Sequence, residues 1–118
     1  MSIRNALASV PVKDLESSIG WYERLFGRRP DSRPMHEVAE WKFAGGGWLQ
    51  VYELTARAGG GSVTLAVRGI DDEIARLAEL GIDTSRRTSG AKVKTVMIAD
   101  PDGNSIAFAE ALDPGMAQ

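Results

Sequence analysis

The sequence has no cysteine and only one histidine, His36. Without cysteine the chain forms neither disulfide bonds nor thiolate metal sites, so its fold must depend on a hydrophobic core. An iron site built from two histidines and one carboxylate also needs more imidazoles than one copy of the chain has. These two absences narrow the metal chemistry that the protein can support.

The chain also lacks an excess of positive charge and any long hydrophobic run. Its 14 lysines and arginines stand against 16 aspartates and glutamates, so nucleic acid is not an expected partner. No apolar segment approaches the ~18 residues of a membrane span, and the first residues lack a signal-peptide pattern. We therefore expect a cytoplasmic protein without membrane association. The length of 118 residues predicts a single domain over residues 1–118, because two separate domains would each be too small for a stable core.

An internal repeat organises the chain. The block Val10–Ile19 aligns with Leu65–Ile74, 55 positions further along, and each block is typical of a strand that leads into a helix. Asp14 is a suitable N-cap for the first helix, and Gly27 and Gly81 are expected to end the two helices. Residues at helical spacing predict a buried stripe on each helix: Leu15, Ile19, Tyr22 and Phe26 on the first, and Ile70, Ile74, Leu77 and Leu80 on the second.

Strand patterns follow each helix, so the order of elements repeats as well. Besides the strand that opens the second block, strands are expected near residues 6–12, 37–44, 48–54, 93–99 and 105–110. A short additional strand is expected in each irregular stretch, 28–34 and 83–92. These elements predict an α+β fold of two tandem βαβββ modules, at about 5–56 and 61–111, with a glycine-rich linker at 58–61.

Two segments of the chain resemble a known family. The first is Val12–Ser18 followed by Trp21–Gly27, and the second is the turn Asp100–Asn104 followed by Ser105–Phe108. Together they resemble signatures of the vicinal oxygen chelate superfamily, which includes glyoxalase I, the bleomycin-resistance proteins and the extradiol dioxygenases. The resemblance spans essentially the whole chain. It implies that the two modules form a curled mixed sheet around an open cleft, with the helices outside.

Metal-using members of this superfamily hold one divalent ion with histidine and glutamate side chains from four strands. The resemblance places the equivalent positions at Leu7, Gln50, Ser62 and Ala107. Two of these side chains have no donor atom and the other two are neutral, so the set is not expected to hold zinc or iron. Two alternatives stay open: a shifted register would bring in Glu53 or Glu110, and a dimer would bring two copies of His36 together.

Alternation along the strands divides the residues between two faces. The face toward the predicted cleft carries Leu7, Ser9, Trp48, Gln50, Tyr52, Ser62, Thr64, Thr95, Met97, Ser105 and Ala107. The face toward the helices is almost purely apolar and carries Ala8, Val10, Val12, Leu49, Val51, Val63, Leu65, Val67, Val96, Ile98, Ile106 and Phe108. The cleft is thus predicted to be small, neutral and partly aromatic, with Trp41 near its rim or at an interface.

This composition predicts a small apolar or aromatic ligand. Trp48 and Tyr52 would form a wall for a flat ring, while Gln50 and Ser62 would orient the ligand by hydrogen bonds. The full predicted ligand-binding set is Leu7, Trp48, Gln50, Tyr52, Ser62, Met97 and Ala107. The alternative is that the aromatic side chains fill the cleft themselves or pack against a second subunit.

The sequence therefore favours a metal-independent binding protein that sequesters a small molecule, needs no cofactor, has no assigned catalytic residue and forms a homodimer. One alternative is an enzyme, either a glyoxalase-like lyase or isomerase or a dioxygenase-type protein with a displaced metal site, or a metal-free enzyme that uses His36. The other alternative to a binding protein is a dimerisation module that has no ligand.

Overall fold

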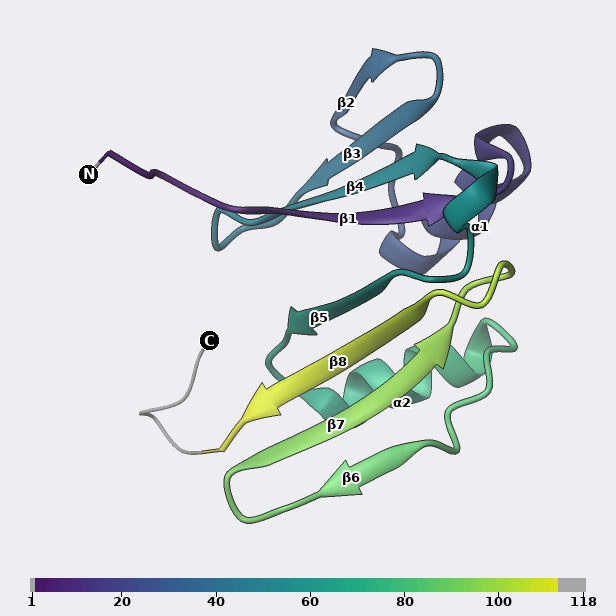
Figure 1. Ribbon diagram of the computed structural model, residues 1–118. Coiled ribbons are helices and arrows are strands. Elements are labelled where there is room, and N and C mark those ends of the chain that lie inside the picture. The colour runs from purple at the N-terminus through teal and green to yellow at the C-terminus, as the bar shows by residue number, and fades with distance from the viewer. Residues whose placement is uncertain (1, 113–118) are drawn as a thin grey trace. The chain divides into compact units, whose positions relative to one another are not determined.

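The computed structural model describes residues 2–112, which form two units, each with one helix and one four-stranded sheet (Figure 1). The first unit contains the chain up to Gly61 together with the short segment 101–104, and the second contains residues 62–100 and the chain from 105 onward. The sequence also indicates a loose tail at residues 111–118. Ala111 is instead the last residue of a strand, and residues 113–118 lie outside the described residues. No helix in the described part of the chain is long and apolar enough to cross a membrane.

The first unit is a βαβββ module whose first and last strands are neighbours. Its sheet has the order β1-β4-β3-β2, in which β1 is parallel to β4 and the other pairs are antiparallel. A parallel pair needs a crossover connection, and the chain that carries the helix supplies it. The elements are β1 (Leu7–Val12), α1 (Leu15–Phe26), β2 (Ser32–Met35), β3 (Val38–Lys42), β4 (Trp48–Glu53) and the short 3₁₀ helix η1 (Thr55–Arg57).

The second unit repeats this topology with the order β5-β8-β7-β6 and a parallel β5–β8 pair. Its elements are β5 (Ser62–Ala66), α2 (Ile70–Glu79), β6 (Arg87–Ser89), β7 (Val93–Ala99) and β8 (Ser105–Ala111). The predicted α+β fold of two βαβββ modules is therefore confirmed. The two short strands expected in the irregular stretches are present as β2 and β6, and the other predicted strands match within two residues.

Local side-chain chemistry sets the helix ends. The Asp14 carboxylate accepts a hydrogen bond from the Glu16 amide at 3.0 Å, which satisfies one of the free donors in the first turn of α1. Gly27 ends α1 in the left-handed conformation with φ 71°, and Gly81 follows the end of α2 with φ 81°. Both glycines occupy conformations that a side chain would strain, so they terminate the helices as the sequence predicts.

The buried stripe of α1 differs from the predicted one by a small rotation. Leu15 and Tyr22 are buried as expected, but Ser18 and Leu25 complete the stripe, and Ile19 and Phe26 keep partial exposure. Spacings of three, four and three residues are as helical as the predicted four, three and four. The stripe includes the small Ser18 because this face of α1 packs against β3 and β4.

Trp41 lies in the core of the first unit, which corrects the expectation that it packs near a rim or an interface. Its side chain is fully buried, and its ring lies 5.3 Å from that of Phe26 and 6.0 Å from that of Tyr22. The indole Nε1–H donates to the carbonyl oxygen of Arg28 at 3.1 Å, so its polar atom is also satisfied. The physical reason is the strand face: Trp41 is directly opposite the buried Leu49 of β4.

This difference in burial predicts unequal effects for two tryptophan substitutions. We expect Trp41→Ala to lower the free energy of unfolding by about 3–5 kcal/mol, because it leaves a large cavity. The matched Trp48→Ala should cost less than about 1 kcal/mol, because Trp48 is only half-buried. Urea unfolding followed by circular dichroism measures both values. Equal losses in the two variants would contradict the assignment of Trp41 to the core.

Candidate ligand-binding surface

Each sheet has one apolar face and one face with polar and exposed side chains. On β1 and β4 the apolar face carries the buried Val10, Val12, Leu49 and Val51, and on β7 and β8 it carries the buried Val96, Ile98, Ile106 and Phe108. Pro11, at an intervening position of β1, is buried as well. The intervening residues point to the opposite face, which we call the open face of each sheet. The predicted division between core and open faces is confirmed, although Ala8, Leu65 and Val67 keep partial exposure.

Four of the predicted ligand-binding residues lie on the open face of the first sheet. Leu7 is directly opposite Trp48, and Trp48, Gln50 and Tyr52 occupy alternate positions along β4. Leu7 is 47% exposed, while the three β4 residues are half-buried. The structure thus brings these four side chains to one surface within one unit.

A hydrogen-bonded row crosses the middle of this open face. Ser9 Oγ donates to Gln50 Oε1 at 3.2 Å, and Gln50 Nε2 donates to Glu40 Oε2 at 3.1 Å. The three residues stand opposite one another on β1, β4 and β3. The Gln50 amide is therefore held between Trp48 and Tyr52 with one N–H and further acceptor capacity left for a ligand.

The open face of the first sheet is not neutral, which corrects the sequence prediction. Glu40 contributes a carboxylate, and Lys42 places its Nζ 5.8 Å from the centre of the Trp48 ring, a cation–π contact. Both residues belong to β3, whose alternation the sequence analysis did not assign. Trp41 was misplaced for the same reason.

The other three predicted residues lie on the open face of the second sheet. Met97 is opposite Ala107, and Ser62 is opposite Ser105. Met97 is 38% exposed, Ser62 is exposed and Ala107 is half-buried. This surface carries uncharged side chains at these positions, of which Met97 is the one large apolar side chain.

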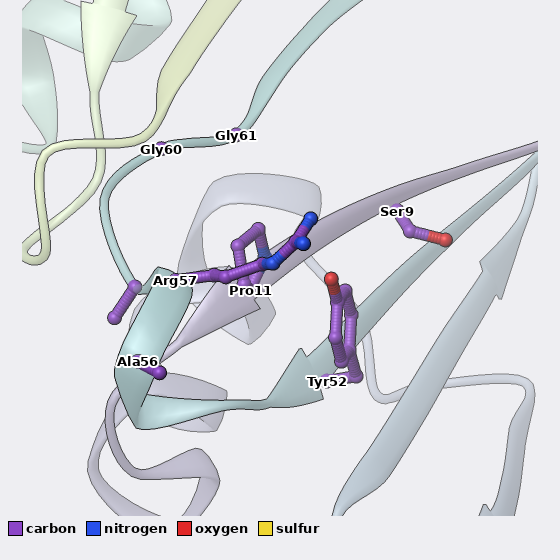
Figure 2. A pocket seen from close by; sticks show the side chains of 8 residues that line it. Ser9, Pro11, Tyr52, Ala56, Arg57, Gly60 and Gly61 are labelled. Carbon is purple, nitrogen blue, oxygen red and sulfur yellow. The ribbon is translucent and has the colours of Figure 1, made fainter.

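A hollow of about 590 Å³ lies beside the open face of the first sheet, where β1 and β4 end (Figure 2). Its lining is Ser9, Pro11, Tyr52, Ala56, Arg57, Ala58, Gly60 and Gly61. Of the predicted ligand-binding residues only Tyr52 lines it. Sequence reasoning missed Arg57, because the pattern after β4 gave no sign of the 3₁₀ turn that carries this side chain.

One wall of the hollow is a glycine loop held in close contact with its surroundings. A side chain at Gly61 would meet Pro11 at 2.7 Å and the Asn104 amide oxygen at 2.9 Å. The Gly61 amide donates to Asn104 Oδ1 at 2.7 Å, and Asn104 Nδ2 donates to the Pro11 carbonyl at 2.7 Å. Asn104 is fully buried, so this side chain fixes the loop against the end of β1.

The residues at the four family metal positions do not fit a divalent ion. Leu7 and Ala107 have no donor atom, and Gln50 already exchanges hydrogen bonds with Ser9 and Glu40. Within residues 2–112 no group of three or more histidine, cysteine, aspartate or glutamate side chains is arranged to hold a metal. His36 lies in an exposed turn between β2 and β3.

The two carboxylates of the shifted register bind helix N-termini. Glu53 Oε1 accepts a hydrogen bond from the Leu15 amide at 3.0 Å, and Glu110 accepts from the Gly69 amide at 2.9 Å and the Ile70 amide at 3.1 Å. Both glutamates therefore satisfy free backbone donors at the start of α1 and α2. They face the helix side, as alternation predicts for Glu110.

We expect Glu110→Gln to destabilise the protein in a pH-dependent way. Hydrogen bonds from the Gly69 and Ile70 amides hold the pKa of Glu110 below its ordinary value of 4.5. A carboxylate whose pKa is lower in the folded state stabilises the fold above the unfolded pKa, and this stabilisation is lost as the pH falls through the folded pKa. The urea midpoint of the variant should thus lie below that of the wild type near neutral pH, with a smaller difference below about pH 4.

Glu79→Gln is a suitable control, because Glu79 is an exposed residue of α2 whose carboxylate makes no hydrogen bond in the described part of the chain. It should leave the urea midpoint nearly unchanged. A midpoint difference for Glu110→Gln that grows on acidification would contradict the capping role.

Comparisons with known proteins agree with this fold. The family model described as the Glyoxalase/Bleomycin resistance protein/Dioxygenase superfamily matches residues 5–108. The crystal structure of a glyoxalase/bleomycin resistance protein from Catenulispora acidiphila is 32% identical, with a TM-score of 0.82, over 92% of this chain and 99% of that one. No curated protein sequence matches the chain.

Two further solved structures share the fold but differ in what their names describe. TnmS3, an antibiotic binding protein from a Streptomyces species, is 24% identical, with a TM-score of 0.80, over 94% of this chain and 98% of its own. A lactoylglutathione lyase from Agrobacterium tumefaciens is 16% identical, with a TM-score of 0.80, over 98% of both chains. At these identities the likeness shows the fold alone, and binders and enzymes both use it.

Proposed function

The chain belongs to the Glyoxalase/Bleomycin resistance protein/Dioxygenase superfamily, and from this premise we propose that it is a metal-independent protein that binds and sequesters a small apolar or aromatic molecule. Because this fold supports both binding and catalysis, the proposal rests on the residues of the site. The antibiotic-binding relative supports it by analogy at the level of fold.

The observation that carries the proposal is the arrangement of three β4 side chains. Trp48, Gln50 and Tyr52 stand on the face of the first sheet opposite α1, with the amide of Gln50 between two rings. Aromatic rings supply affinity through buried area, and a fixed amide supplies orientation. This combination suits a flat ring with one or two hydrogen-bonding groups.

The same residues argue for sequestration over turnover. Ser9 and Gln50 are neutral, and the Glu40 carboxylate accepts its hydrogen bond from an amide, which does not take part in proton transfer at ordinary pH. His36 lies outside this row, in a turn. The proposal therefore assigns no catalytic residue, and the enzyme alternative would need ligands that the four family positions lack.

The proposal extends to properties that remain predictions. Ser62, Met97 and Ala107 on the second open face are proposed as additional ligand contacts. We also expect the protein to act in the cytoplasm and to form a homodimer.

Tryptophan fluorescence tests the proposed binding. A library of small aromatic molecules should contain compounds that quench the emission of the wild type at micromolar concentration. Trp48→Ala should weaken their binding about tenfold or more, because it removes one ring of the wall. Trp21→Phe is the control, since Trp21 lies on α1, on the other side of the sheet. If no compound binds, or if binding is lost only in the control, the proposal is wrong.

Metal addition tests the proposed metal independence. Protein purified without a histidine tag should contain far less than one equivalent of zinc, iron, nickel or manganese by elemental analysis. Adding these ions should leave the melting temperature unchanged, whereas an ion at ~100 times its Kd would stabilise the fold by about 2.7 kcal/mol. One tightly held ion per chain would overturn this part of the proposal and favour the enzyme.

A further inference from the structure

We propose that Arg57 makes the hollow of the first unit selective for aromatic anions, meaning flat rings that carry a carboxylate or sulfonate group. This inference rests on the proposed function and names the chemical class of its ligand. The sequence alone predicted a neutral site, but Arg57, on the η1 turn that follows β4, is a charged residue in the lining of the hollow.

Backbone contacts fix the position from which Arg57 extends. The Leu54 amide donates to the Val12 carbonyl at 2.9 Å, so the chain entering η1 is joined to the end of β1. The hydroxyl of Thr55 donates to the Lys13 carbonyl at 3.2 Å, and the Gly60 amide donates to the Arg57 carbonyl at 3.0 Å. The side chain thus starts from a turn that is held on both sides.

The direction of the side chain brings its charge to the hollow. Figure 2 shows the Arg57 side chain extending past Pro11 toward the hydroxyl end of Tyr52, with Ser9 on the same side. Two hydroxyl groups and one guanidinium are therefore the side-chain polar groups among the eight residues that line the hollow. No lining residue is acidic, so the local field favours a negative group.

The guanidinium is available for a ligand. Within residues 2–112 its nitrogens make neither an ion pair nor a hydrogen bond. Two other arginines of the first unit are engaged: Arg28 pairs with Asp31 at 2.5 Å, and Arg33 donates to the His36 carbonyl at 2.9 Å. The carboxylate of the hydrogen-bonded row on the open face, that of Glu40, accepts a hydrogen bond from the Gln50 amide.

The chemistry of the two groups defines the ligand. An arginine presents a planar fork of donors that matches a carboxylate in two parallel hydrogen bonds and suits a sulfonate as well. The half-buried Tyr52 ring offers a surface for an aromatic ring. A molecule that joins a ring to an anionic group contacts both the guanidinium and the Tyr52 ring, whereas a neutral ring contacts only the Tyr52 ring.

A matched pair of fluorescent probes tests the inference. The two probes are 1-anilinonaphthalene-8-sulfonate, an aromatic anion, and N-phenyl-1-naphthylamine, which has the same rings without the sulfonate. We expect Arg57→Gln to weaken binding of the sulfonate about tenfold and to leave binding of the neutral probe unchanged. Raising the salt concentration should weaken sulfonate binding in the wild type more than in the variant.

Two controls keep the result specific. Arg29→Gln removes another exposed arginine of the first unit that does not line the hollow, so it should change neither affinity. Arg57→Lys keeps the charge but not the fork, and it should restore part of the sulfonate affinity. Unchanged circular dichroism and melting temperature in Arg57→Gln would show that the fold is intact.

The outcomes separate this inference from the proposed function. If both probes bind and Arg57→Gln weakens neither, or both equally, the inference is wrong while small-molecule binding stands. If neither probe binds the wild type, both the inference and the proposed function are contradicted. Selective loss of the sulfonate supports both.

Discussion

The parallel pairing of the first and last strands is the constraint on which each module depends. In the first unit it places β1 against β4, and therefore Leu7, Ser9 and Pro11 opposite Trp48, Gln50 and Tyr52. The same pairing brings the end of the last strand beneath the start of the helix, where Glu53 and Glu110 accept backbone amides. A single register thus sets the apolar face, the helix position and the composition of the open face.

The turn that carries the family resemblance has a structural role at the hollow. Residues 101–104 cluster with the first unit, although they connect two strands of the second. Asn104 bonds to both Gly61 and Pro11, and Asp102 accepts from the Lys13 amide at 2.9 Å. A buried amide with both ends bonded is costly to replace. The wall of the hollow therefore depends on the second repeat of the sequence.

Sequence reasoning succeeded where a repeating pattern was present and failed where it was not. Alternation on β1, β4, β7 and β8 identified the core and the open faces, because a period of two leaves few registers. On β3 no alternation was assigned, so the burial of Trp41 and the charges of Glu40 and Lys42 were missed. The position of Arg57 beside the hollow could not be predicted from a sequence pattern, because the direction of its side chain follows from a three-residue turn and the backbone contacts that hold this turn.

These features divide affinity and selectivity between different groups. The rings of Trp48 and Tyr52 supply nondirectional surface, which favours many flat molecules nearly equally. The row from Ser9 through Gln50 to Glu40 is bonded before any ligand arrives, so orienting a ligand against it requires little reorganisation. Selectivity between ligands must then come from a polar group that makes no hydrogen bond or ion pair in the free protein. In the lining of the hollow the guanidinium of Arg57 is such a group and carries a charge. A neutral ligand leaves it in water, whereas an anion engages it.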